Sequence, residues 1–245
     1  MNTLNEPDIT RHESPHYGEN ATAIYGNDYA AAYESLYIEP WREKHKLNAR
    51  NLAAVLRNLK TPRPVWLDLA CGQAWHFSMF PGQASMVGVD LSQAQLARAR
   101  ARVPQAAFIH GDMARVAFPA ASIDLITNFW AAYCYLGSEE RIASMLKNAV
   151  SWIRPGGALY IEVLLGRDLE SFNRSRFAGR TGFTVKPRSE DYTQWGYEDV
   201  GGWHEMTSPP LEFFLDLLSP GFEQIQATHD SAFMVHFIAT GRKRP

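Results

Sequence analysis

Two apolar runs and the turn between them carry the first residues that could do chemistry. The run 65–69 leads into a turn of small residues around Gly72, and after a short helical segment the run 86–89 ends at Asp90. Asp90 follows Gly72 by 18 residues, about where nucleotide-binding parallel sheets place a carboxylate that accepts both ribose hydroxyls. A side chain at Gly72 would keep the backbone away from such a ligand. The expected chemistry is therefore recognition of a nucleoside.

The spacing of small residues in this turn separates two nucleotide-binding patterns. A dinucleotide-binding turn would require G-x-G-x-x-G, whereas Ala70, Gly72 and Ala74 are spaced two apart behind Asp68. This pattern resembles the D-x-G-x-G-x-G loop of class I S-adenosylmethionine (SAM)-dependent methyltransferases, with alanine replacing the first and third glycine. The resemblance implies SAM as the cofactor, with contacts from Asp68, Ala70, Gly72, Asp90 and Leu91.

A second match to this family lies at the end of the next expected strand, 106–110. Gly111-Asp112-Met113 resembles the family's adenine-binding loop, in which the aspartate accepts from the adenine amino group and the next backbone N–H meets a ring nitrogen. An ordinary aspartate turn or helix cap is the alternative interpretation. Because the first turn already matches at a neighbouring strand end, we expect Asp112 and Met113 to bind the cofactor, together with Asn128 after the fourth strand.

Aromatic residues recur at four-residue spacing near the N-terminus, at Tyr25, Tyr29, Tyr33, Tyr37 and Trp41. The spacing predicts a helix with one aromatic face. That face either packs against the rest of the protein or caps the cofactor. The stretch DYAAAYESLY resembles the N-terminal segment of many small-molecule methyltransferases, in which a tyrosine reaches the cofactor, and the matching position is Tyr33.

The order of the expected elements predicts an α/β fold. Strands and helices alternate through 64–163, and a turn at 154–157 precedes the fifth strand. The resemblance implies a seven-stranded, mostly parallel, doubly wound sheet in the order 3-2-1-4-5-7-6, with an N-terminal helical cap and a β-rich insertion between the fifth and sixth strands. The expected parts are an arm and cap at 1–60, a SAM-binding core at 61–164, an insertion roofing the substrate pocket at 165–210, and a last helix with a closing hairpin at 211–245.

The insertion is the expected place of the acceptor. It is too long for a bare connection and is rich in aromatic residues, so we expect a pair or trio of antiparallel strands there. An aromatic lining suits a small, flat acceptor, and its expected residues are Trp130, Tyr133, Tyr135, Trp195, Tyr197 and Trp203. His204 can take a proton near neutral pH, although a surface position on a strand is an equally good interpretation. The expected substrate-binding residues are Trp130, Tyr133, Trp203 and His204, and the catalytic candidates are His204 and Tyr133.

The resemblance predicts a SAM-dependent methyltransferase that moves a methyl group to N or O of a small, flat or aromatic acceptor, of the kind made in secondary metabolism. Three other classes stay open: an enzyme that cyclises SAM or eliminates from it, a nucleic-acid or protein methyltransferase, and a binder without catalysis. The N-P-P-Y motif of nucleic-acid amino-methyltransferases is replaced here by Asn128-Phe129-Trp130-Ala131, which argues against a nucleic-acid substrate.

Composition sets further limits. The 245-residue chain has 24 Lys and Arg against 26 Asp and Glu, a formal net charge of −2. This balance gives no positive electrostatic field that would attract a polyanion. Cys71 and Cys134 predict neither a disulfide framework nor a metal cluster. The polar N-terminus lacks an apolar signal segment, and no apolar run approaches membrane-spanning length. We expect a cytoplasmic protein with a small-molecule acceptor, no metal, and no nucleic-acid or membrane partner, and the oligomeric state stays open, with a homodimer as the candidate.

Overall fold

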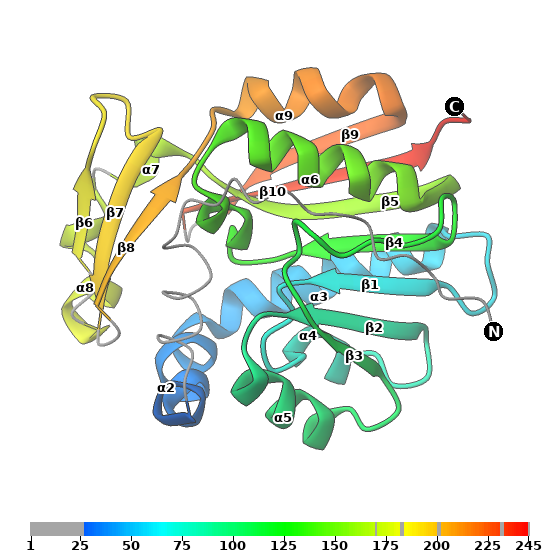
Figure 1. The fold of residues 1–245 in the computed structure, drawn as a ribbon, viewed down its shortest axis with the longest axis horizontal. Coiled ribbons are helices and arrows are strands. Elements are labelled where there is room, and N and C mark those ends of the chain that lie inside the picture. Colours follow the sequence, from blue (N-terminus) through cyan, green and yellow to red (C-terminus); the bar gives the residue numbers. More distant parts are fainter. Residues whose placement is uncertain (1–26, 170, 182–183, 200–201, 231–232, 245) are drawn as a thin grey trace, which may run out of the picture.

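The computed structural model describes residues 27–169, 171–181, 184–199, 202–230 and 233–244 (Figure 1). The expected polar arm and Tyr25 lie outside these residues. Within them, no helix combines the length and the apolar character needed to cross a membrane.

One seven-stranded sheet forms the centre of the protein. Its strands are β1 (Val65–Leu69), β2 (Ser85–Asp90), β3 (Ala107–His110), β4 (Ile123–Asn128), β5 (Ile153–Leu164), β9 (Phe222–His229) and β10 (Met234–Arg242). They lie in the order β3-β2-β1-β4-β5-β10-β9, with β1 to β5 parallel and β10 antiparallel to both of its neighbours. The expected fold class is confirmed. The last two strands lie where strands 7 and 6 were expected, and they are labelled β10 and β9 because three insertion strands precede them in the chain.

Helices cover both faces of this sheet. α6 (Glu139–Trp152) and α9 (Leu211–Leu218) pack on one face, against side chains that include Leu67. The other face, which includes Trp66, is covered by α3 (Arg42–Asn58), α4 (Trp75–Ser78) and α5 (Gln93–Arg102). Successive residues of a strand point to opposite faces, so both faces of β1 are buried and its sequence is apolar almost throughout.

The turn expected at 154–157 is part of β5 in the structure. Ile153 pairs with Ile123 of β4, whereas the next pair joins Ala158 to Leu125, so four residues of β5 lie opposite a single residue of β4. Gly156 has φ +84°, a conformation that a glycine adopts without a steric penalty. The Pro-Gly-Gly sequence therefore produces a bulge inside the strand rather than a turn before it.

The N-terminal cap is a broken helix rather than a continuous one. α2 (Asn27–Tyr33) continues as a π-helical turn, Glu34–Ile38, and a 3-10 turn, Glu39–Trp41, before α3 begins. Pro40 lies in the 3-10 turn and has no N–H to continue an α-helix. The cap is tied to the turn after β1, because Gln73 Nε2 donates to Ala30 O at 2.6 Å.

The insertion forms a second, three-stranded antiparallel sheet in the order β6-β7-β8, as expected for a trio of strands. Its elements are α7 (Gly166–Leu169), a 3-10 turn (Phe172–Arg174), α8 (Arg176–Thr181), β6 (Thr184–Pro187), β7 (Gln194–Asp199) and β8 (Gly202–Thr207). In Figure 1 this yellow sheet stands on the left, at the carboxyl ends of β1 and β4, above α2. The insertion and the cap therefore flank the edge of the sheet where ligands bind in open α/β folds.

A buried chain of hydrogen bonds joins β1 to β4 on the face covered by α3. Trp66 Nε1 donates to Thr127 Oγ1 at 2.9 Å, and Thr127 Oγ1 donates to Asp68 Oδ1 at 2.6 Å. Burial raises the pKa of Asp68 to about 8, although the bond from Thr127 acts in the opposite direction. The folded protein therefore holds a proton on this carboxyl under conditions in which the unfolded chain has lost it.

This raised pKa gives a prediction about stability. Between pH 4 and 8 the unfolded chain binds fewer protons than the folded one, so Asp68 makes the protein less stable as the pH rises, by up to about 1.4 kcal/mol per pH unit. Asp68→Asn keeps an acceptor for Thr127 but does not titrate. Thermal unfolding across this range should show a flatter profile for Asp68→Asn than for wild type, with the larger gain at pH 8. Parallel profiles for the two proteins would contradict the assignment.

Candidate functional site

A cavity of about 220 Å³ opens at the carboxyl ends of the parallel strands. Its wall combines parts that are far apart in the sequence: Tyr33 of the cap, Gly72 of the turn after β1, Trp130 of the loop after β4, and Tyr197 of the insertion. The predicted site residues that line it are Tyr33, Asp68, Ala70, Gly72, Asp90, Leu91, Met113 and Trp130. The predicted residues that do not line it are Asp112, Asn128, Tyr133, Trp203 and His204.

Asp90 holds the turn after β1 in place. Its Oδ2 accepts the N–H of Gly72 at 2.8 Å, and its Oδ1 accepts the N–H of Ser92 at 2.8 Å. Each carboxylate oxygen keeps a second lone pair for a ligand. Burial raises the pKa of Asp90, while the two backbone bonds act in the opposite direction.

The small residues of the turn share an unusual backbone conformation. Ala70, Gly72 and Ala74 have φ values of 62°, 52° and 56°, all in the left-handed region. Such a conformation costs an alanine about 1 kcal/mol or more, whereas a glycine adopts it freely. This explains why the family pattern has glycine at all three positions, and it shows that this chain tolerates strain at two of them. A Cβ at Gly72 would have no protein atom beyond its chain neighbours within 4 Å and would point into open space.

Two buried polar atoms in the cavity wall have no hydrogen-bond partner among the described residues: Trp75 Nε1, a donor, and Gln95 Oε1, an acceptor. An unpaired buried polar group costs free energy, so a bound ligand that pairs with it is favoured. The expected cofactor carries both an adenine amino group, which donates, and a carboxylate, which accepts. The residues around the turn therefore fit a ligand of this kind.

Two of the expected cofactor residues have other partners. Asp112 Oδ1 accepts the N–H of Ala114 at 2.8 Å, which is the aspartate turn given above as the alternative interpretation, while its neighbours Gly111 and Met113 do line the cavity. Contrary to expectation, Asn128 is turned into the structure. Its Nδ2 donates to Leu69 O at 2.8 Å and its Oδ1 accepts the N–H of Tyr133 at 3.2 Å, so its amide joins β4 to β1 and fixes the following loop.

The expected catalytic residue Tyr133 is also part of the core. It is fully buried, its ring packs edge-on against Phe214, and its hydroxyl accepts the N–H of Leu164 at 3.0 Å. Burial raises the pKa of this hydroxyl well above its usual value. Tyr133 therefore stabilises the loop after β4, whereas Tyr135, two residues later, reaches the cavity wall.

Strand pairing in the insertion decides which aromatic residues face the cavity. Tyr197 pairs with His204, and both lie on the inner face of the sheet, where Tyr197 lines the cavity. His204 stacks behind Tyr197 with a ring separation of 4.2 Å and is 2% exposed. Contrary to expectation, Trp203 lies on the outer face, packed over Gly196, with the ammonium of Lys186 5.2 Å from its ring.

Further aromatic residues line the cavity, and one of them, Phe233, was missed in the sequence. Trp41 and Tyr37 belong to the four-residue aromatic stripe, which was the available signal. Tyr135 and Tyr197 belong to the aromatic lining expected from the sequence, and both line the cavity with their hydroxyls hydrogen-bonded to each other. Phe233 lies next to the last strand, contacts Trp41 at a ring separation of 6.4 Å, and carries no sequence signal of a site.

Comparison with known proteins supports this description. Residues 67–157 match the model of a methyltransferase domain family. A curated relative, dTDP-3-amino-3,4,6-trideoxy-alpha-D-glucopyranose N,N-dimethyltransferase of Streptomyces venezuelae, is 24% identical over 140 residues, which are 57% of this chain and 58% of the relative. The chain thus matches little more than half the length of such curated relatives.

Solved structures extend the likeness over most of the chain. DesVI of Streptomyces venezuelae aligns with a TM-score of 0.65 at 18% identity, over 88% of this chain and 99% of that one. The SAM-bound amino pentose methyltransferase CalS10 of Micromonospora echinaspora aligns with a TM-score of 0.60 at 20% identity, over 89% and 98%. At these identities the alignments show a shared fold. With the strand order and the small-residue turn, they show the class I, Rossmann-like methyltransferase fold, and residues 67–157 within it match a methyltransferase domain family.

Proposed function

We propose that the protein transfers the methyl group of SAM to N or O of a small, flat organic acceptor. The observation that carries this proposal is a single cavity in which a nucleoside-binding turn, with Gly72 and Asp90, continues into an aromatic compartment with Trp130 and Tyr197. The insertion then roofs the acceptor and the cap encloses the cofactor. When bound, SAM supplies an activated methyl group on a sulfonium.

The residues of the turn would hold the cofactor. The carboxylate of Asp90 suits the ribose hydroxyls, the backbone around Gly111 and Met113 suits the adenine, and Tyr33 closes the site from the cap. Holding the acceptor in line with the methyl group can supply roughly 7–11 kcal/mol of the barrier. An acceptor that is neutral as bound needs no base before attack, so the wall has mainly to orient it.

The wall also restricts the acceptor. Among the described residues that line the cavity, none is Lys or Arg, and the acceptor side is formed by rings such as Trp41, Trp130, Trp195 and Phe172. Such a wall favours a neutral aromatic or flat acceptor. An amino sugar is the second candidate, because two curated relatives are named as N,N-dimethyltransferases of dTDP-amino sugars. A diphosphate would find no cationic side chain in the described wall, so we place the aromatic acceptor first.

Calorimetry and mass spectrometry together test the function. SAM and S-adenosylhomocysteine should bind, and NAD should not. With SAM and an extract of the host, the enzyme should add the mass of one methyl group to a small molecule. Consumption of SAM without a methylated product would instead support cyclisation or elimination, and tighter binding of NAD than of S-adenosylhomocysteine would overturn the proposal.

Removing Asp90 should weaken cofactor binding most. Asp90→Ala loses hydrogen bonds to a charged acceptor, worth about 1.5–3 kcal/mol each, and frees the N–H of Gly72, so affinity for S-adenosylhomocysteine should fall about tenfold to a hundredfold. Asp112→Ala should cost less, since Asp112 does not line the cavity. Calorimetry on both variants checks the order. A folded Asp90→Ala protein with wild-type affinity would remove Asp90 from the site.

The two faces of the insertion sheet give a matched pair of variants. Tyr197→Phe removes a hydroxyl from the cavity wall and should lower kcat/KM for the acceptor about threefold to tenfold, with affinity for S-adenosylhomocysteine nearly unchanged. Trp203→Phe changes the outer face and should leave both quantities at the wild-type level. Equal losses in the two variants would show that the insertion acts through its stability and not through its inner face.

A further inference from the structure

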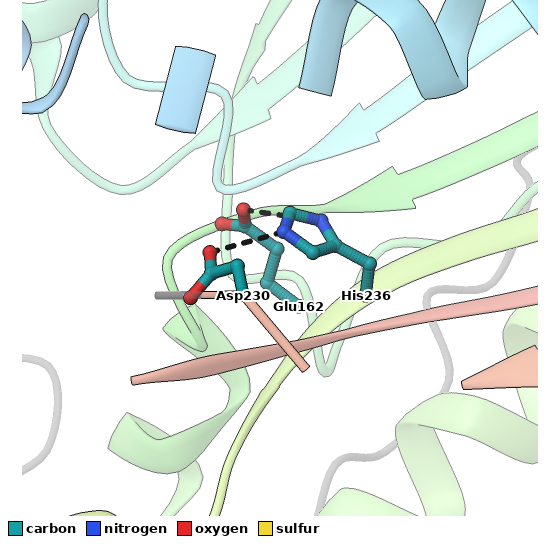
Figure 2. A group of neighbouring side chains, drawn as sticks. All are labelled: Glu162, Asp230 and His236. Carbon is teal, nitrogen blue, oxygen red and sulfur yellow. Dashed lines mark hydrogen bonds and ion pairs between the residues drawn. The ribbon is translucent and has the colours of Figure 1, made fainter. Parts of the chain in front are cut away.

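A cluster of buried ionisable side chains lies where β5 and β10 pair (Figure 2). Glu162 of β5 and His236 of β10 are partners in the pairing, and Asp230 directly follows β9. His236 Nε2 lies 3.0 Å from Asp230 Oδ2, and His236 Nδ1 lies 3.8 Å from Glu162 Oε1. The side chains are at most 4% exposed. Each offers an atom within 4.8 Å of the others, a spacing at which a metal ion could bind.

Lys44 of α3 supplies positive charge to this cluster instead. Its ammonium donates to Glu162 Oε1, and its side chain is 1% exposed. The second carboxylate oxygen, Glu162 Oε2, accepts the N–H of Trp130 at 2.6 Å. His236 Nδ1 lies 2.6 Å from the hydroxyl of Tyr160. These atoms already have partners in the protein, so the cluster is a closed hydrogen-bond network. The ammonium of Lys44 supplies the positive charge that a metal ion would otherwise supply.

Stability alone does not account for such a network. Removing two charges from water costs several kcal/mol per ion, and well-packed apolar residues often replace a buried ion pair without loss. Burial alone raises the pKa of Glu162, yet the charges of Lys44 and His236, with the hydrogen bonds from Lys44 and Trp130, hold that pKa below its usual value. The carboxylate therefore stays charged, and its contacts show what this side chain does.

Both members of the ion pair contact Trp130. Glu162 accepts its backbone N–H, and the Lys44 ammonium lies 4.2 Å from the centre of its ring. Trp130 and Ala131 have φ values of 57° and 49°, a left-handed conformation that residues with a side chain rarely adopt. Strained backbone of this kind persists only where the surroundings determine it, and it is concentrated at functional sites. Trp130 lines the cavity, and the ring of Trp41 meets it at 6.1 Å.

We infer that Glu162, whose charge is balanced by Lys44, is a positioning residue: its hydrogen bond to the Trp130 N–H holds the strained loop after β4, so that Trp130 forms the cavity wall against which the acceptor aligns. This inference rests on the proposed methyltransferase function. His236 and Asp230 complete the network by fixing the Glu162 carboxylate from β10. The network joins α3, the sheet and the loop after β4. It therefore shapes the acceptor side of the cavity without touching the acceptor.

Two double variants isolate the hydrogen bond to Trp130. Lys44→Met/Glu162→Gln removes both charges but keeps a side-chain oxygen for the Trp130 N–H. Lys44→Met/Glu162→Leu removes the same charges and offers no acceptor. Each protein is measured for thermal unfolding, S-adenosylhomocysteine affinity, kcat and KM on the acceptor found in extract, and the indole N–H resonance of Trp130, assigned by its loss in Trp130→Phe.

The Gln variant should keep kcat within about threefold of wild type, with the Trp130 resonance in place. The Leu variant should lose about tenfold to a hundredfold in kcat, because a small displacement of an aligning wall has an effect of this size. Its S-adenosylhomocysteine affinity should stay within about threefold, and its Trp130 resonance should shift. A Leu variant with wild-type kcat and an unshifted resonance would overturn the inference, as would equal losses in both variants.

Hydrogen exchange on the wild-type protein keeps the test independent of whether the Leu variant folds. The backbone N–H of Trp130 should exchange at least about a hundredfold more slowly than in an unfolded chain, because it is hydrogen-bonded to the fully buried carboxylate of Glu162. Exchange at the unfolded rate would overturn the inference. Neither this measurement nor the indole resonance needs an acceptor. A wild-type protein that transfers no methyl group would therefore refute the proposed function separately.

Discussion

The hydrogen bond between the N–H of Gly72 and the carboxylate of Asp90 is the constraint around which the site is built. It links the turn after β1 to the end of β2, and parallel pairing of these strands brings the two groups together. In the turn that makes this bond, three alternate residues have the left-handed conformation. The backbone strain at Ala70 and Ala74 thus accompanies the turn that places Gly72 and Asp90 together in the cavity wall.

Three carboxylates near one edge of the sheet are stabilised in different ways. Asp68 keeps a proton and accepts from Thr127, so it adds no charge to the site. Asp90 accepts the N–H groups of Gly72 and Ser92 and lines the cavity. Glu162 is balanced by Lys44 and holds the loop after β4. The edge of the sheet therefore combines one uncharged acid, one acid available to a ligand and one acid that fixes a wall.

The acceptor side depends on packing between elements rather than on any one of them. Trp41 from the cap contacts both Trp130 from the loop and Phe233 beside β10, although the three come from distant parts of the chain. The insertion adds its inner face through Tyr197 and places His204 behind it. The rings of this compartment come from four separate segments. A substitution in any one of them can therefore change which acceptor fits, while the cofactor turn stays the same.

The sequence by itself determined the fold class and the residues of the turn, because both follow from local patterns. Gly72 and Asp90 are held by neighbouring strands, so their spacing is informative. Tertiary structure alone decided that Asn128 and Tyr133 point into the core, and that Tyr197 faces inward while Trp203 faces out. These directions depend on strand register, which is set by long-range pairing. The Lys44–Glu162 pair spans 118 residues, and no local pattern can signal two side chains that meet only when the cap packs on the sheet.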